Sequence, residues 1–454
     1  MNAAGQRALV VGLGASGRAA SSLLRRLGAK VAVTDDRGAP QAQDGVDPHD
    51  AETWIDTDSV QSSILDFDLV VTSPGVPRGH RVLAAAESAG IEIVSELELG
   101  ARAVGKPIVA VTGTNGKSTT VTLLAEILAC AGRRVFVGGN LGNPLCNAVG
   151  DDAEICVVET SSFQLEWISQ FHPCAAAILN LSPDHLDRHG TLEEYGATKL
   201  RIFAAMSDSD HAVLCRDEHW WRGRLGEFRG RLSTFGSTPL GSGEAGLVHD
   251  HAARVLRDSE GREVRLAGSW PQAPYDFANV AAAAELARSL GAEWDHVTRT
   301  VESFDGLDHR LHRVDTIAGV EFWNDSKATN VGATIASLDA FSAPVVLLVG
   351  GVAKGASFES LREAVLARPA VRHVIAFGES SAQIVTAFGD ARRVPAVLEA
   401  GTMADAFAIA GDVATEGDVV LLAPACASFD EFSGYAERGR VFEEMVAAAR
   451  VTRG

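Results

Sequence analysis

The chain has few cysteines and no long apolar run. Its six cysteines form neither a CxxC pair nor the dense spacing of a disulfide framework. We therefore expect reduced thiols and no structural zinc. No apolar run reaches the roughly 18 residues that a membrane-spanning helix needs. Because Met1–Arg7 is short and polar, the sequence predicts a cytoplasmic protein without membrane insertion.

Basic residues are also scarce. Forty lysines and arginines stand against 59 acidic residues, which gives a formal net charge of −19. Such a charge repels nucleic acid and anionic membranes, so neither is an expected partner. An anionic substrate must instead meet local basic side chains and Mg²⁺. The length of 454 residues suffices for about three domains of roughly 150 residues each.

The segment with the clearest chemical meaning is Val111–Thr120, which reads VTGTNGKSTT. A β-branched run precedes it, and apolar residues at helical spacing follow it. A glycine loop between a strand and a helix brings backbone N–H groups and the positive end of the helix to phosphate oxygens. In such a loop Lys117 reaches the β- and γ-phosphates, and Ser118 can ligate Mg²⁺. The segment therefore predicts a bound nucleoside triphosphate.

This loop is a shortened variant of the strict pattern, which expects a glycine five residues before Gly116, where Val111 stands. The alternative interpretation is a plain glycine turn whose helix is capped by Thr114 or Asn115. The flanking strand and helix favour the phosphate loop.

The alternation of apolar runs and alanine-rich helical stretches predicts three α/β domains. We expect an N-terminal Rossmann-like domain over 1–104, a central ATPase-like domain with a mostly parallel sheet over 105–306, and a C-terminal Rossmann-like domain over 307–454. The region 222–268 gives few periodic signals and is interpreted as a hairpin-rich insertion.

A second glycine loop, Gly12–Gly17, follows the first predicted strand, and Asp35 lies 18 residues after Gly17. The residue types and their place after a strand both match the dinucleotide-binding fingerprint. The loop is consistent with NAD, with the diphosphate of any nucleotide-linked substrate, or with a turn that binds nothing. Two phosphate loops favour two nucleotide-like ligands, one of them ATP.

Three further residues stand out in the middle of the chain. Glu159 ends a predicted buried strand, where an acid that ligates Mg²⁺ belongs. The alternative is a carboxylate that caps the following helix through Ser161 or Ser162. His185 follows another strand in a segment with two histidines and two aspartates, which favours a metal or phosphate role. Lys199, on a predicted helix, would by itself be interpreted as a solvated lysine.

Five motifs together resemble the Mur ligase family, namely residues 112–119, 159–164, 179–187, 325–330 and 424–430. The last two of these motifs are typical of members that add D-glutamate. The resemblance implies an enzyme with an N-terminal domain for the UDP-sugar, a central ATPase domain and a C-terminal domain that brings the amino acid and closes over ATP. We expect a monomer. The resemblance also implies that UDP-N-acetylmuramoyl-L-alanine is activated by ATP to an acyl phosphate, which the amine of D-glutamate then attacks. Both steps accumulate negative charge, which fixed cations stabilise.

The resemblance also assigns roles to individual residues. It implies catalytic roles for Lys117, His185 and Lys199. Two Mg²⁺ ions would be held by Ser118, Glu159, His185 and a carbamylated Lys199. ATP would be bound by Gly113, Thr114, Asn115, Gly116, Lys117, Ser118, Thr119, Asn279, Arg310, Asp325 and Lys327. The UDP-substrate would be bound by Ser16, Asp35, Arg37, Gly75 and Asn140, and D-glutamate by Thr329, Lys354, Ser428 and Tyr435.

The chain departs from the family pattern before Asn279, where Tyr275 and Asp276 replace a His-Asn pair. Asp36 after Asp35 is a second departure, in the uridine pocket. By sequence alone Asp325 and Lys327 also fit a helix cap with an ion pair. Alternatives for function are the same chemistry with L-glutamate or another amino acid, a non-catalytic nucleotide sensor, and an NAD-dependent dehydrogenase.

Overall fold

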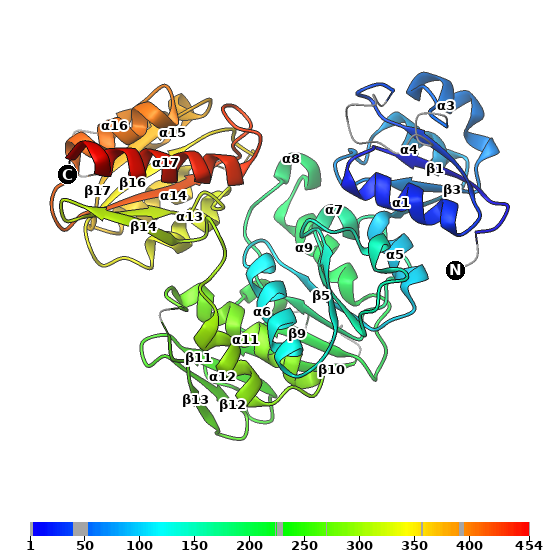
Figure 1. The fold of residues 1–454 in the computed structure, drawn as a ribbon, viewed down its shortest axis with the longest axis horizontal. Helices are drawn as coiled ribbons and strands as arrows, with labels where there is room; N and C mark the ends of the chain where they lie inside the picture. Colours follow the sequence, from blue (N-terminus) through cyan, green and yellow to red (C-terminus); the bar gives the residue numbers. More distant parts are fainter. Residues whose placement is uncertain are drawn as a thin grey trace. The chain divides into compact units, whose positions relative to one another are not determined.

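The computed structural model describes residues 3–39, 53–222, 224, 230–268, 270–355, 357–389 and 395–453. It contains three sheets with helices against them (Figure 1). The chain contacts divide it into two compact units, which are described separately. The first unit holds the N-terminal and central sheets, and the second holds the C-terminal sheet with Ser182–Leu192 and Gly268–Phe277. The α/β fold with three sheets is as predicted, whereas the domain boundaries at 104/105 and 306/307 stay predictions.

The N-terminal sheet is fully parallel, in the order β2-β1-β3-β4. Its strands are apolar on both faces because helices cover both, and this explains their continuous β-branched runs. The strands are β1 Arg7–Val11, β2 Lys30–Thr34, β3 Leu69–Thr72 and β4 Glu92–Ser95, and the helices are α1 Ala15–Arg26, α3 Thr57–Ser63, η2 Ile64–Asp66, α4 Arg81–Ser88 and α5 Glu96–Val104.

The central sheet has nine strands, in the order β13-β12-β11-β10-β9-β8-β5-β7-β6. Its strands are β5 Ile108–Thr112, β6 Val135–Gly139, β7 Ile155–Glu159, β8 Ala175–Ile178, β9 His211–Cys215, β10 Arg231–Gly236, β11 Gly246–Asp250, β12 Val255–Asp258 and β13 Glu263–Arg265. Its helices are α6 Lys117–Cys130, η3 Leu145–Ala148, α7 Ser162–Leu165, α9 Leu192–Leu200, η4 Arg201–Phe203, α10 His219–Arg222, α11 Pro274–Ser289 and α12 Trp294–Ser303.

The region 222–268 extends this sheet. β10 pairs parallel with β9 and with β11, whereas β11, β12 and β13 form an antiparallel meander. The expectation of hairpins is therefore correct for the meander, but β10 continues the parallel part of the sheet. Residues 223 and 225–229 of the region lie outside the described residues.

The C-terminal sheet has the order β14-β15-β19-β16-β17-β18, and only β14 runs antiparallel to its neighbour. Its strands are β14 His312–Ile317, β15 Val320–Asn324, β16 Val345–Gly350, β17 Val371–Phe377, β18 Ala396–Glu399 and β19 Val419–Ala425. The helices of this unit are α8 Leu186–His189, α13 Val331–Leu338, α14 Glu359–Leu366, α15 Ser381–Phe388, α16 Met403–Val413 and α17 Tyr435–Arg453.

Two apolar clusters fill the faces of the C-terminal sheet. One packs α13 and α14 against the strands, and the other packs α16 and α17 against them (Figure 1). No helix in the described parts of the chain is long and apolar enough to cross a membrane.

Candidate active site

The phosphate loop has the predicted context, because it joins β5 to α6 in the first unit. Gly116 caps α6 with φ of 84°, a left-handed conformation that favours glycine. A Cβ at this position would also collide with Oδ1 of Asn279. The Lys117 Nζ donates to the carbonyls of Gly113 and Thr114 at 3.0 and 2.8 Å. The lysine therefore lies over the loop, where it can exchange carbonyls for phosphate oxygens.

Asn180 fixes the shape of this loop. Its Oδ1 accepts from the backbone N–H of Asn115 at 2.8 Å, and its Nδ2 donates to the Asn115 carbonyl at 3.0 Å. Its own carbonyl accepts from the N–H of Thr114. Sequence reasoning gave Asn180 no role, although its place at the end of a buried strand beside the loop was a usable signal.

Glu159 lies beside the phosphate loop because β7 is the neighbour of β5, with Glu159 opposite Val111. Its Oε2 accepts from the hydroxyl of Ser118 at 2.6 Å, and its Oε1 accepts from Nδ2 of Asn140 at 2.6 Å. Ser161 caps the next helix in a capping box with Gln164, as the alternative for this segment predicted, but Glu159 is not part of that capping box.

The donor set around Glu159 fits Mg²⁺. A hydroxyl and a carboxylate meet within hydrogen-bond distance, and both are hard oxygen ligands. Within the described ranges, no group of three or more His, Cys, Asp or Glu side chains is arranged to hold a metal. Mg²⁺ commonly binds through one or two carboxylates with phosphates and waters as its other ligands, so this sparse set is sufficient.

Lys199 on α9 is not a solvated lysine. Only 1 % of it is exposed, its Nζ donates to the Gly113 carbonyl at 2.9 Å, and the Tyr195 ring lies 4.2 Å from the nitrogen. A buried amine at the phosphate loop agrees with a functional role, and its carbamylation stays a prediction. Asn279 on α11 also adjoins the loop, with its Oδ1 3.4 Å from Oγ1 of Thr120.

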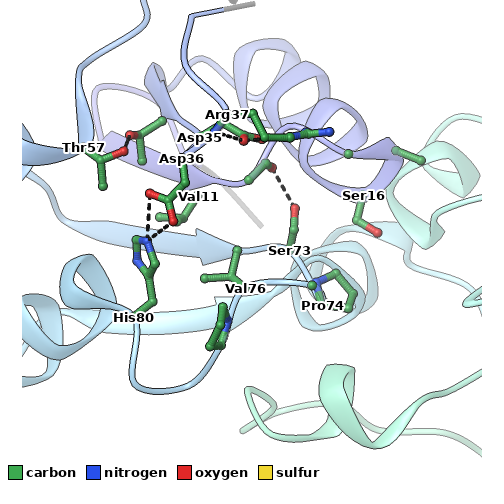
Figure 2. A pocket seen from close by; sticks show the side chains of 16 residues that line it. Val11, Ser16, Asp35, Asp36, Arg37, Thr57, Ser73, Pro74, Val76 and His80 are labelled. Atoms are coloured by element: carbon green, nitrogen blue, oxygen red, sulfur yellow. Dashed lines mark hydrogen bonds and ion pairs between the residues drawn. The ribbon is translucent and has the colours of Figure 1, made fainter. Parts of the chain in front are cut away.

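A pocket of about 380 Å³ opens at the first glycine loop, at the carboxyl ends of β1, β2 and β3 (Figure 2). Four of the five residues predicted for the UDP-substrate line it: Ser16, Asp35, Arg37 and Gly75. The fifth, Asn140, lies at the central sheet beside Glu159.

Asp35 shapes this pocket. It accepts from the backbone N–H of Leu13 at 2.7 Å and from the Arg37 guanidinium, and the bond with Arg37 holds its pKa well below the usual range. Its neighbour Asp36 binds Nε2 of His80 at 3.1 Å, as Figure 2 shows. Because Nδ1 of His80 accepts from the Val82 N–H, Nε2 carries the proton. Sequence analysis did not find His80 or Thr57 in this pocket.

The second unit gathers other predicted residues around Asp184. The Nζ of Lys354 lies 3.7 Å from Oδ1 of Asp184 and donates to the Thr329 hydroxyl at 3.3 Å. Asn330 donates to the other carboxylate oxygen at 3.0 Å. His185, with φ of 53°, follows directly, and its Nε2 is 3.7 Å from Asp184. Asp184 belongs to the motif at residues 179–187, but sequence analysis did not assign it a role.

Asp325 is buried at the end of β15 and is not a helix cap, because Asn330 caps α13. Its carboxylate accepts from the Ser337 hydroxyl, and burial raises its pKa to about 6, against a lowering effect of Arg310. Lys327 precedes Asn330, the cap of α13, by three residues. Its Nζ lies 3.7 Å above the ring of Tyr435, and Ser428 lies buried after β19.

Asp276, one of the two departures before Asn279, caps α11. Its carboxylate accepts from the backbone N–H groups of Gln272 and Ala273 at 3.1 and 3.0 Å. Burial raises its pKa to about 6. Tyr275 packs against the apolar core of the second unit. Both departures therefore have structural partners within this unit.

These observations define a nucleotide-binding enzyme of the α/β class, with a phosphate loop, an acid beside it and a pocket at a second glycine loop. Three family models match successive parts of the chain: the Mur ligase MurD-like N-terminal domain over residues 6–95, the Mur ligase middle domain over 111–278, and the Mur ligase glutamate ligase domain over 309–426. The chain belongs to the Mur ligase family.

Two relatives are similar over almost their full lengths. The UDP-N-acetylmuramoylalanine–D-glutamate ligase of Syntrophus aciditrophicus is 39 % identical, with 99 % of both chains covered. The enzyme of the same name from Koribacter versatilis is 38 % identical, with 98 % of both covered. Among solved structures, the MurF ligase of Thermotoga maritima in complex with ADP has a TM-score of 0.62 at 20 % identity, covering 99 % of this chain and 96 % of that one. That likeness supports the fold.

Proposed function

We propose that this chain joins D-glutamate to UDP-N-acetylmuramoyl-L-alanine, with ATP converted to ADP and phosphate, as a step of peptidoglycan precursor synthesis. The contact of Ser118 with Glu159 beneath the phosphate loop carries the proposal, because it provides a place for a metal-bound triphosphate. Full-length relatives named for this reaction support the choice of substrates. Because ATP and UDP-linked sugars are cytoplasmic compounds, we place the reaction in the cytoplasm.

The first chemical step is attack of the substrate carboxylate on the γ-phosphorus of ATP, which forms an acyl phosphate as the bond to ADP breaks. We assign Lys117 to the transferred phosphoryl group, and its bonds to two carbonyls of the phosphate loop support this role. Lys199 lies on the same loop through Gly113. Mg²⁺, when bound, would neutralise phosphate charge, with Ser118 and Glu159 as its protein ligands. We assign a second Mg²⁺ to His185 and a carbamylated Lys199.

The second step is attack of the D-glutamate amine on the acyl carbon, with loss of phosphate and of one proton from the nitrogen. D-Glutamate brings two carboxylates, and its site therefore needs a cation and neutral donors. We assign these roles to Lys354, Thr329 and Ser428, with Tyr435 beside them. The support is the bond between Lys354 and Thr329, with Asp184 orienting the ammonium group.

We assign Asn279, Arg310, Asp325 and Lys327 to the nucleotide, and the pocket at Gly12–Gly17 to the uridine diphosphate. An NAD-dependent dehydrogenase would leave the phosphate loop and Lys117 without a use. The pocket at the first glycine loop is therefore better explained by the UDP part of the substrate.

Phosphate release, measured with each of the three substrates omitted in turn, tests the proposal. We expect release only when ATP, UDP-N-acetylmuramoyl-L-alanine and D-glutamate are all present. Turnover that needs neither of the last two would contradict it. The same assay with L-glutamate tests the alternative amino acid, and added NAD should give no hydride transfer.

A further inference from the structure

Glu96 is a buried carboxylate that the proposed reaction does not use. It is the first residue of α5, and 0 % of it is exposed. Its Oε1 accepts from the backbone N–H of Cys146 at 2.7 Å, while its Oε2 is buried without a hydrogen-bond partner in the described parts of the chain. Burying a carboxyl group is costly. An apolar residue would pack at this position without that cost. The hydrogen bond to Cys146 is therefore the property that distinguishes Glu96 from an apolar residue.

Cys146 belongs to η3, a short helix whose backbone is held from several sides. The guanidinium of Arg26 on α1 donates to the carbonyls of Cys146 and Val149, and Nζ of Lys106 donates to that of Ala148. α5 approaches closely at Gly100, where a Cβ would lie 2.9 Å from the Cys146 nitrogen. Glu96 supplies the only side-chain acceptor that the described residues offer to the Cys146 N–H.

A short loop connects η3 to the candidate metal site. Only residues 141–144 separate η3 from Asn140. The Asn143 carbonyl in that loop accepts from the N–H of Gly139, the last residue of β6, at 2.8 Å. Asn140 is bound to Glu159 twice, by its N–H to the Glu159 carbonyl at 2.9 Å and by Nδ2 to Oε1 at 2.6 Å. This loop therefore connects η3 to Asn140, whose side chain bonds to the Glu159 carboxylate.

We propose that Glu96 is a positioning residue, which fixes η3 and, through Asn140, holds the Glu159 carboxylate in its metal-binding orientation. It thereby couples α5, at the end of the N-terminal sheet, to the metal site of the central sheet. The inference rests on the proposed function in one respect, the assignment of Glu159 to Mg²⁺. It differs from a purely structural role, in which Glu96 would affect the amount of folded protein but not the metal site.

Three variants of the full chain separate these roles. Glu96→Gln keeps an acceptor for the Cys146 N–H, Glu96→Leu removes it, and Glu87→Leu is a matched control at an exposed position on α4. We would measure ADP affinity with Mg²⁺ and with a chelator, and amide hydrogen exchange over residues 139–148. We would then measure the KM for UDP-N-acetylmuramoyl-L-alanine and the KM for D-glutamate.

We expect Glu96→Leu to weaken the Mg²⁺-dependent gain in ADP affinity at least five-fold and to speed exchange over 139–148. We expect it to raise the KM for the UDP-substrate while leaving that for D-glutamate unchanged. Glu96→Gln and Glu87→Leu should behave as the wild type. If Glu96→Leu does not fold, Glu96→Asp, whose shorter side chain falls short of the N–H, carries the same test.

Unchanged Mg²⁺ dependence and exchange in a folded Glu96→Leu or Glu96→Asp protein would overturn the proposal. Failure of the ligase reaction in the wild type would contradict the proposed function instead. The ADP and exchange measurements need no turnover, so the two failures are distinguishable.

Discussion

Lys199 illustrates how burial changes the meaning of a side chain. Its exposed fraction of 1 % and its bond to Gly113 place an amine against the phosphate loop. The resemblance to Mur ligases implies a carbamate at this position, and the burial is compatible with it.

We predict that Lys199→Ala lowers kcat at least 100-fold and that small carboxylates such as formate partly restore it, because they can replace the carbamate oxygens. Lys199→Arg keeps a positive charge but cannot be carbamylated, and should stay inactive without rescue. Steady-state phosphate release measures both. Full activity of Lys199→Arg would show that a cation suffices.

Gly116 carries a backbone requirement that can be measured against a matched glycine. Gly116 and Gly132 flank α6 with φ of 84° and 83°, but only at Gly116 would a Cβ collide with Asn279, while Gly132 faces open space. We predict that Gly132→Ala costs about 1 kcal/mol of unfolding free energy from its backbone conformation alone. Gly116→Ala should cost more and should weaken ATP binding at least ten-fold.

Urea denaturation and calorimetric ATP titration measure the two effects. Equal behaviour of both variants in both experiments would mean that the contact with Asn279 does not shape the loop.

Among the elements, the N-terminus of α11 is held by a group that titrates near neutrality. The pKa of Asp276 is raised to about 6 by burial, from a model-peptide value near 4. Its contribution to stability is therefore fully present below pH 4 and is lost as the pH rises through 6. Arg310, Asp325 and Tyr275 are the charged and titratable groups that act on it.

We predict that Asp276→Asn, which keeps an acceptor for the two capping N–H groups, is more stable than the wild type at pH 8 and not at pH 4. One pKa unit corresponds to about 1.4 kcal/mol, so the gain should reach about 2 to 3 kcal/mol at most. Denaturant midpoints at pH 4, 6 and 8 measure it. A difference independent of pH would contradict the assigned titration.

Buried strands and edge strands differ in how well the sequence pattern predicts them. The buried strands β1, β5 and β7 were predicted because continuous apolar runs are typical of parallel sheets covered on both faces. The edge strands β14 and β18 were not, because their exposed positions carry mixed residues without a period. The glycine turn at Gly319 was a usable signal for the β14–β15 hairpin.

For the whole molecule, the roles proposed for the phosphate loop and Lys354 require groups from both compact units to act on one acyl phosphate. The phosphate loop belongs to the first unit, and Lys354 belongs to the second. We predict that an ATP analogue together with UDP-N-acetylmuramoyl-L-alanine lowers the radius of gyration in solution, since closure excludes water from the reactive intermediate. Small-angle scattering measures this, with each ligand alone as the control. No compaction with both ligands would contradict it, and the same data test the expected monomer.

The sequence by itself determined the chemistry and the fold class, because both depend on local patterns. A strand, a glycine loop and Lys117 predict a phosphate site wherever they occur in this order. Only the tertiary structure decided which distant residues meet. Glu159 contacts Ser118 because β7 adjoins β5. Asp184 and Lys354 are far apart in the sequence and meet only because the second unit folds them together. Burial of Glu96, Asp276 and Lys199 is likewise a property of the packed chain, and no local pattern encodes it.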